Sequence, residues 1–306
     1  MLAVRKELEA MIEKERPNLS VNSKKTYLGV LNKAVARVAK EKHSNNLEVV
    51  LNDTKDMLDY VKSLDKPQTR KTLCSALFIL TKNQDYKTQM LDDVAIVNKF
   101  YREQKVSSSR KDEMKSYEEI HARAQQIIDA YKSNPSHQNI QDAILAYVCS
   151  GYDEALPPRR VLDYVMRIRG WDKSKESKDN YYDKGTFYFN NYKTARKYGT
   201  QTIKCPKQLE QIINKWKKLN TGGDYLFINS DGKPITSSGL AKRIKALFGA
   251  SCDVLRSIFI SHMYRNMPQL QHLEQVATDM GHTVSTAMNY YVKPELHGRI
   301  RDFKLV

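Results

Sequence analysis

The chain has 306 residues, enough for two domains, because single hydrophobic cores usually stop growing near about 250 residues. Lys and Arg outnumber Asp and Glu by 51 to 35, a formal charge of +16. This charge favours a polyanionic partner, nucleic acid first, with a lysine-coated soluble surface as the alternative. No apolar run approaches the about 20 residues of a membrane span, so we expect a soluble intracellular protein without membrane attachment.

Residues 1–105 are predicted to form an all-helical domain. Apolar residues recur at spacings of three and four, and polar breaks such as Ser20-Val-Asn-Ser23 supply N-cap candidates. We expect helices over 2–15, from Ser20 through Val38, and over 53–64, 68–82 and 90–103.

The polar, serine-rich stretch from Gln104 to Met114 lacks periodic apolar positions, so a linker is predicted over 106–116. Residues 117–306 are predicted to form an α+β domain with a small antiparallel sheet. Helices are expected over 117–132 and 139–151, followed by a lysine-rich loop to Lys184. Strands over 186–192 and 200–204 are expected to form a hairpin, and helices return from Gln208.

The cysteines indicate neither a metal site nor disulfides. Cys74, Cys149, Cys205 and Cys252 lie far apart, with no Cys-x-x-Cys pair. We expect free buried thiols in a reducing compartment. We also expect no metal and no cofactor, since Asp, Glu, His and Cys do not cluster as a ligand set.

Two arginines follow a double proline. Pro157-Pro158 ends the preceding helix and is predicted to start the next, which would place Arg159 and Arg160 at a helix N-terminus that favours an anion. Asp163 lies one turn later and could orient Arg160. The alternative is a surface arginine pair that caps a helix with a local ion pair.

Lys193 lies in the expected hairpin turn, where a lysine can deliver a proton to a leaving oxygen or simply be solvated. Arg256 is bracketed by a predicted core-facing stripe and would lie at the edge of a packed helix, functional or merely snorkelling. This stripe consists of Leu255, Phe259 and Ile260.

Three aromatic or imidazole side chains follow near the C-terminus. His282 comes after Gly281, a predicted helix C-cap, and Tyr290 and Tyr291 lie on the next predicted helix. Taken singly, each of the three is more often a packing residue, and the chain has 18 tyrosines.

Together these residues resemble a known family. Leu255-Arg256-x-x-Phe259-x-x-His262, followed by Met280-Gly281-His282 and Tyr290-Tyr291, is similar to the motifs of the tyrosine recombinases, the phage-type integrases. The resemblance covers the second half in order and spacing, and the helical first half is similar in size to the family's core-binding domain. The double proline resembles divergent integrases of viruses and mobile elements.

The resemblance implies a role for each matching residue. Tyr291 is the nucleophile, with Tyr290 as its competitor; Arg160, Arg256 and His282 stabilise the phosphate, and Lys193 protonates the leaving 5′-oxygen. Asp253 stands where the family usually has histidine, and its role is open because a carboxylate near a phosphate adds repulsion.

The implied activity is metal-free cleavage and rejoining of double-stranded DNA through a 3′-phosphotyrosyl link, by a homotetramer on DNA. The alternatives are a topoisomerase with the same chemistry and a catalytically inactive DNA-binding protein of this fold. Basic residues near helix starts and the hairpin are predicted to contact phosphates, or else to be solvated: Lys24, Lys25, Arg70, Lys197 and Lys242.

Overall fold

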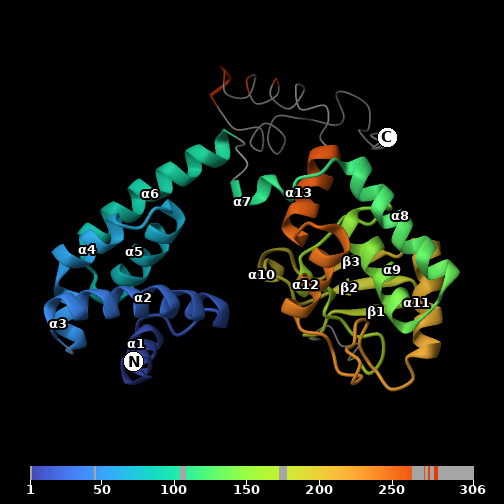
Figure 1. Ribbon diagram of the computed structural model, residues 1–306, viewed down its shortest axis with the longest axis horizontal. Helices are drawn as coiled ribbons and strands as arrows, with labels where there is room; N and C mark the ends of the chain where they lie inside the picture. Colours follow the sequence, from blue (N-terminus) through green and yellow to red (C-terminus); the bar gives the residue numbers. More distant parts are fainter. Residues whose placement is uncertain are drawn as a thin grey trace. The chain divides into compact units, whose positions relative to one another are not determined.

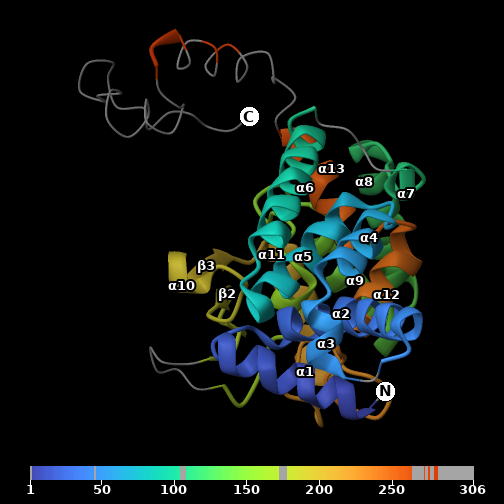
Figure 2. The ribbon, with the colours of Figure 1, turned by 90° about the vertical axis from the view of Figure 1, so that its left-hand side faces the viewer.

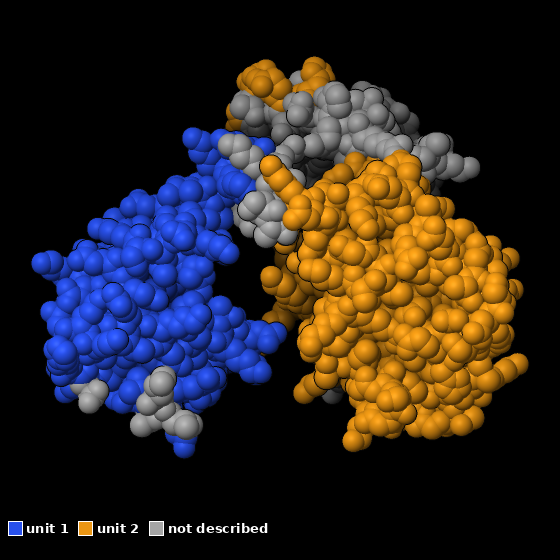
Figure 3. Space-filling model, in the orientation of Figure 1, with its two compact units in different colours: residues 1–107 blue, residues 108–306 orange. Residues whose placement is uncertain are grey.

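The computed structural model describes residues 2–44, 46–103, 108–171 and 178–263, with 272, 275 and 279–281. The chain divides into two compact units, residues 1–107 and 108–306 (Figure 3). The division falls inside the predicted linker. Part of that stretch, Ser108–Lys111, forms the short helix α7 of the second unit.

The described part of the first unit is entirely helical, as predicted. N-cap residues explain where several of its helices begin. The side chain of Ser20 accepts from Ser23 N, Asn46 caps a six-residue helix that was not predicted, and Pro67 begins α5. The helices are α1 (Leu2–Glu15), α2 (Val21–Lys42), α3 (Leu47–Asn52), α4 (Thr54–Lys62), α5 (Pro67–Thr81) and α6 (Gln84–Arg102).

The core of this unit forms where α5 packs on α6 and α2 (Figure 2). One ion pair lies inside it. Asp93 is fully buried, and Arg70 donates to it from Nε at 2.8 Å, while Arg70 Nη1 donates to the carbonyl of Leu64 at 2.8 Å. Through the bond to Asp93, the guanidinium of Arg70 on α5 is joined to α6.

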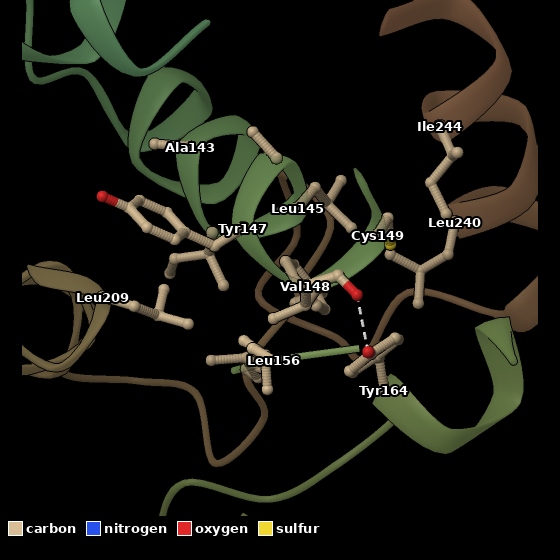
Figure 4. Close-up of a cluster of buried hydrophobic side chains, with 14 of the residues drawn as sticks. Ala143, Leu145, Tyr147, Val148, Cys149, Leu156, Tyr164, Leu209, Leu240 and Ile244 are labelled. Atoms are coloured by element: carbon tan, nitrogen blue, oxygen red, sulfur yellow. Dashed lines mark hydrogen bonds between the residues drawn. The ribbon is translucent and has the colours of Figure 1, made fainter. Parts of the chain in front are cut away.

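The second unit is built around one helix. Residues 140–150 of α9 (His137–Ser150) are all buried, and α8, α11, α12 and α13 each pack on α9 (Figure 1). Figure 4 shows Leu145 and Val148 of α9 among the buried hydrophobic side chains of this core. The surrounding helices are α8 (Tyr117–Ser133), α11 (Lys207–Leu219), α12 (Ser237–Phe248) and α13 (Cys252–Met263).

A three-stranded antiparallel sheet, in the order β1-β2-β3, completes the unit. β2 (Thr186–Phe189) pairs with β3 (Gln201–Lys204), which confirms the predicted hairpin, but β2 ends earlier than predicted and the four-residue helix α10 (Ala195–Tyr198) lies between the strands. β1 (Tyr181–Asp183) lies in the stretch predicted as a loop. Its three residues are too few to give a period-2 signal.

The end of the predicted linker is bound to the second unit. Glu113 accepts from Lys245 Nζ at 2.9 Å and from Ser251 N at 2.9 Å, and these bonds lower the pKa of Glu113 to about 2. Lys115 Nζ also donates to the carbonyl of Phe248 at 2.9 Å. Residues 113–115 are therefore a packed segment rather than a free tether.

None of the helices within the described ranges is both long and apolar enough to cross a membrane. The four cysteines are free and buried. In the same described ranges, no three His, Cys, Asp or Glu side chains are grouped so that they could hold a metal ion.

Gly151 ends α9 in the left-handed conformation, with φ of 71°, and a Cβ there would lie 2.1 Å from Cδ2 of Phe259 on α13. We expect Gly151→Ala to lower the free energy of unfolding by about 3 kcal/mol, from overpacking plus backbone strain. Gly232→Ala is the control, because Gly232 has φ of 75° but open space around it. Urea unfolding measures both, and equal losses would contradict the role given to the Phe259 contact.

Candidate active site

The two arginines after the double proline lie at the start of a helix, as predicted, but this helix is a short 3-10 turn. Arg160 precedes a four-residue 3-10 helix, η1 (Val161–Tyr164), and makes no side-chain cap bond. The turn cannot lengthen because Met166 and the residues after it are extended and bonded: Arg167 N donates to Asn180 O, and Ile168 N to Asp224 O. The expected helix N-terminus is therefore that of a single 3-10 turn, with Arg160 as its N-cap.

Arg159 is held firmly on several sides. Its Nε donates to Asp163 Oδ2 at 3.0 Å and its Nη1 to Gln201 Oε1 at 2.8 Å. The guanidinium also lies over two rings, 4.0 Å from the centroid of Phe189 and 5.0 Å from that of Tyr192. Asp163, predicted to orient Arg160, thus holds Arg159 instead.

Arg160 differs from its neighbour. It is half-buried, and its guanidinium has no hydrogen bond or ion pair to any described residue. Its backbone carbonyl accepts from Asp163 N at 2.9 Å, which fixes the turn beneath it. The N–H donors of the Arg160 guanidinium are therefore free to bind another group.

Arg256 approaches the same turn from α13. The Sγ of Cys252, in the first turn of that helix, donates to the carbonyl of Arg159 at 3.3 Å. Arg256 Nη1 donates to Asp253 Oδ1 at 3.3 Å, while its buried Nε has no partner among the described residues. In the predicted core-facing stripe, Leu255 and Phe259 are buried, but the prediction for Ile260 is wrong, because it is 50% exposed and lies outside the buried face of α13.

The charge of these arginines acts on one buried carboxyl group. Burial raises the pKa of Asp163, and the positive charges of Arg159, Arg160 and Arg256 oppose this rise. Oδ1 of Asp163 is buried without a hydrogen-bond partner in the described part of the chain. The direct contact among these is the ion pair with Arg159, and the charges of Arg160 and Arg256 add smaller effects that favour the ionised carboxyl group.

Asp253 lies at the exposed start of α13, where 65% of its side chain is accessible. Besides Arg256, it has Arg110 Nη2 at 4.0 Å from its Oδ2. It thus neutralises part of the charge that Arg256 would offer to an anion.

Lys193 lies in the turn between β2 and α10 and is exposed. Its neighbour Tyr192 is buried, packs under the guanidinium of Arg159 and donates from its hydroxyl to the carbonyl of Gly199 at 2.7 Å. The Lys193 turn is therefore anchored next to the arginine turn.

Other predicted site residues are spread more widely. His282, Tyr290 and Tyr291 lie outside the described residues. Lys24 pairs with Glu13. The remaining predicted DNA contacts, apart from the occupied Arg70, are exposed: Lys25 on α2, Lys197 on α10 and Lys242 on α12.

The sequence did not reveal the residues that support the arginines. Asn180 lies in the stretch predicted as a loop, Gln201 was interpreted only as part of the predicted strand over 200–204, and Cys252 only as a buried thiol. Phe189 and Tyr192, two aromatic residues of the predicted strand over 186–192, were the available hint, since aromatic faces attract guanidinium groups.

The fold and the site together describe a mostly helical protein with a small antiparallel sheet, against which Arg159 packs. Among the solved structures that are similar to the chain are two recombinases. One is a crystal structure of a lambda integrase(75-356) dimer bound to a COC′ core site, 15% identical, covering 85% of this chain and 88% of that one, with a TM-score of 0.44.

The other is the crystal structure of XerA recombinase, 15% identical, covering 86% of this chain and 85% of that one, with a TM-score of 0.35. No protein-family model and no curated protein matches the chain. The chain is thus distantly similar in structure to a lambda integrase and to XerA recombinase. A likeness this distant assigns no role to any residue.

Proposed function

We propose that the chain cleaves and rejoins double-stranded DNA as a tyrosine recombinase. The observation that carries this proposal is the guanidinium of Arg160, which has no hydrogen bond or ion pair to any described residue, in the turn where Arg159 packs on Tyr192, the neighbour of Lys193. Guanidinium groups suit the charged oxygens of a phosphodiester in transition. The formal charge of +16 supports a DNA partner.

In the proposed reaction, the phenol of Tyr291 gives its proton to solvent, its oxygen forms a bond to phosphorus, and the bond from phosphorus to the 5′-oxygen breaks. Lys193 gives its proton to that oxygen, and Arg160, Arg256 and His282 neutralise the pentacoordinate phosphate. The 3′-phosphotyrosyl link preserves the bond energy, so another 5′-hydroxyl can reverse the step. We propose that a homotetramer on DNA performs this exchange, and that Lys25, Lys197 and Lys242 contact phosphates.

One observation favours a second candidate, a catalytically inactive DNA-binding protein of this fold. Asp253 pairs with Arg256 and would repel a phosphate brought to it. In an active enzyme this pair must open when DNA binds. The kinship with viral and mobile-element integrases stays a prediction.

The test is covalent trapping on nicked suicide substrates made from DNA of the replicon that encodes the protein. We expect wild type and Tyr290→Phe to form an adduct at the 3′ side of the break, and Tyr291→Phe to form none, because the phenyl ring has no nucleophile. Denaturing gels with the label on either side of the nick measure the adduct.

Tight DNA binding by wild type without an adduct would favour the inactive protein instead. Relaxation of supercoiled DNA by a monomer, without strand transfer between partners, would favour a topoisomerase. An adduct that survives in Tyr291→Phe but not in Tyr290→Phe would move the nucleophile to Tyr290.

A further inference from the structure

Asn180 is a buried asparagine that uses its whole hydrogen-bonding capacity. Only 4% of the residue is exposed. Its Nδ2 donates to the carbonyl of Asp163 at 3.0 Å and to that of Asn191 at 2.9 Å. Its Oδ1 accepts from Asn190 N at 2.8 Å and from Asn191 N at 2.7 Å. An amide has two donors and room for two acceptor bonds, so none is left over.

These four bonds join two segments that are distant in the sequence. One is the arginine turn, at the carbonyl of Asp163; the other is the backbone of Asn190 and Asn191, directly before Tyr192 and Lys193. Asn190 extends the connection to the far side of the turn, since its side chain accepts from Thr200 Oγ1 at 2.8 Å and donates to Asp179 O at 2.9 Å.

The side chain of Lys193 is exposed and has no hydrogen bond or ion pair within the described ranges. The position of its ammonium group relative to the arginines therefore depends on where the backbone of the turn is held. Tyr192, directly before Lys193, is held through the ring contact with Arg159. Asn180 ties the two residues before Tyr192 directly to the backbone of the arginine turn.

We propose that Asn180 is a positioning residue, which sets the register between the lysine that protonates the leaving oxygen and the arginines that hold the phosphate. This inference rests on the proposed function. It predicts that damage to Asn180 acts on proton delivery, not on phosphate binding.

The test variant is Asn180→Asp, which keeps the shape of the side chain but replaces both donors by a carboxylate oxygen facing two carbonyls. We expect cleavage of an ordinary suicide substrate to slow about 100-fold, the scale of a lost general acid. A substrate with a 5′-bridging sulfur has a leaving group that needs no proton, so we expect less than about a 10-fold loss there, as for Lys193→Ala.

The same variant should respond to pH. Burial and the facing carbonyls raise the pKa of an introduced carboxyl group, and its protonated form regains one donor. The rate of Asn180→Asp relative to wild type, on the oxygen substrate, is therefore expected to rise as the pH falls from about 8 to about 6.

Asn191→Asp is the matched control. It places the same charge nearer to Lys193, but the Asn191 side chain is exposed and only its backbone takes part in the bonds described above. We expect its rates on both substrates to stay within about threefold of wild type, because an exposed charge is screened. Asn190→Ala, at a half-buried position, weakens the same network without a buried charge. It should show a smaller loss confined to the oxygen substrate even if Asn180→Asp folds poorly.

Equal losses on the two substrates, in variants whose thermal unfolding and DNA binding match wild type, would overturn the positioning role. If wild type cleaved neither substrate, that result would instead contradict the proposed function, and this inference with it. The substrate comparison thus separates the two failures.

Discussion

Arg160→Ala is expected to slow formation of the DNA adduct by about 100- to 1,000-fold, the cost of removing one donor from a charge-stabilising site. The free energy of unfolding should hardly change, because the guanidinium of Arg160 has no partner in the described part of the chain. Single-turnover cleavage and urea unfolding measure the two effects.

Arg196→Ala on α10 is the control, since Arg196 is an exposed arginine next to the Lys193 turn. Arg160→Lys tests geometry, because lysine keeps the charge but cannot bind two oxygens side by side. Full activity in Arg160→Ala would remove this residue from the site and leave Arg256 as its arginine.

Arg159→Ala should show the opposite pattern, with a loss of about 3 kcal/mol in the free energy of unfolding. The substitution leaves the carboxylate of Asp163 buried without its partner: the two side chains are 15% and 3% exposed, respectively. It also removes the guanidinium from the face of Phe189. Urea unfolding of the full chain is the measurement.

The pH dependence of this loss has a defined sign. Burial already raises the pKa of Asp163, and without Arg159 that pKa rises further. The loss is therefore largest at high pH, where the carboxyl group is ionised, and shrinks as the pH falls and the group becomes protonated. Asp163→Asn in the same chain should recover much of the stability, whereas an equal, pH-independent loss in the double variant would contradict the ion-pair explanation.

Most helices could be predicted because their signals are local. Ser20 and Gly151 lie at the ends of apolar patterns with helical spacing, and the structure has them as the N-cap of α2 and the C-cap of α9. Where the element is short, the signal fails: α3 has six residues and β1 three, so neither contains enough turns or alternations to show a period.

The site was predictable only as a set of positions. Spacing pointed to Arg160 and Arg256, but it could not tell which arginine Asp163 would hold. That choice depends on which side chain turns toward Phe189, a strand residue thirty positions away from Arg159 in the sequence. The four bonds of Asn180 likewise depend on segments that meet only in the folded unit.

The burial of α9 limits the substitutions that this protein can accept during evolution. An amphipathic helix such as α11, where Leu209, Ile213 and Trp216 are buried and Lys218 is exposed, can accept substitutions on its outer side. From Ile140 to Ser150, α9 has no outer side. A substitution there needs a compensating substitution in a neighbouring helix. The sequence of α9 should therefore change more slowly in evolution than the sequences of the helices that surround it.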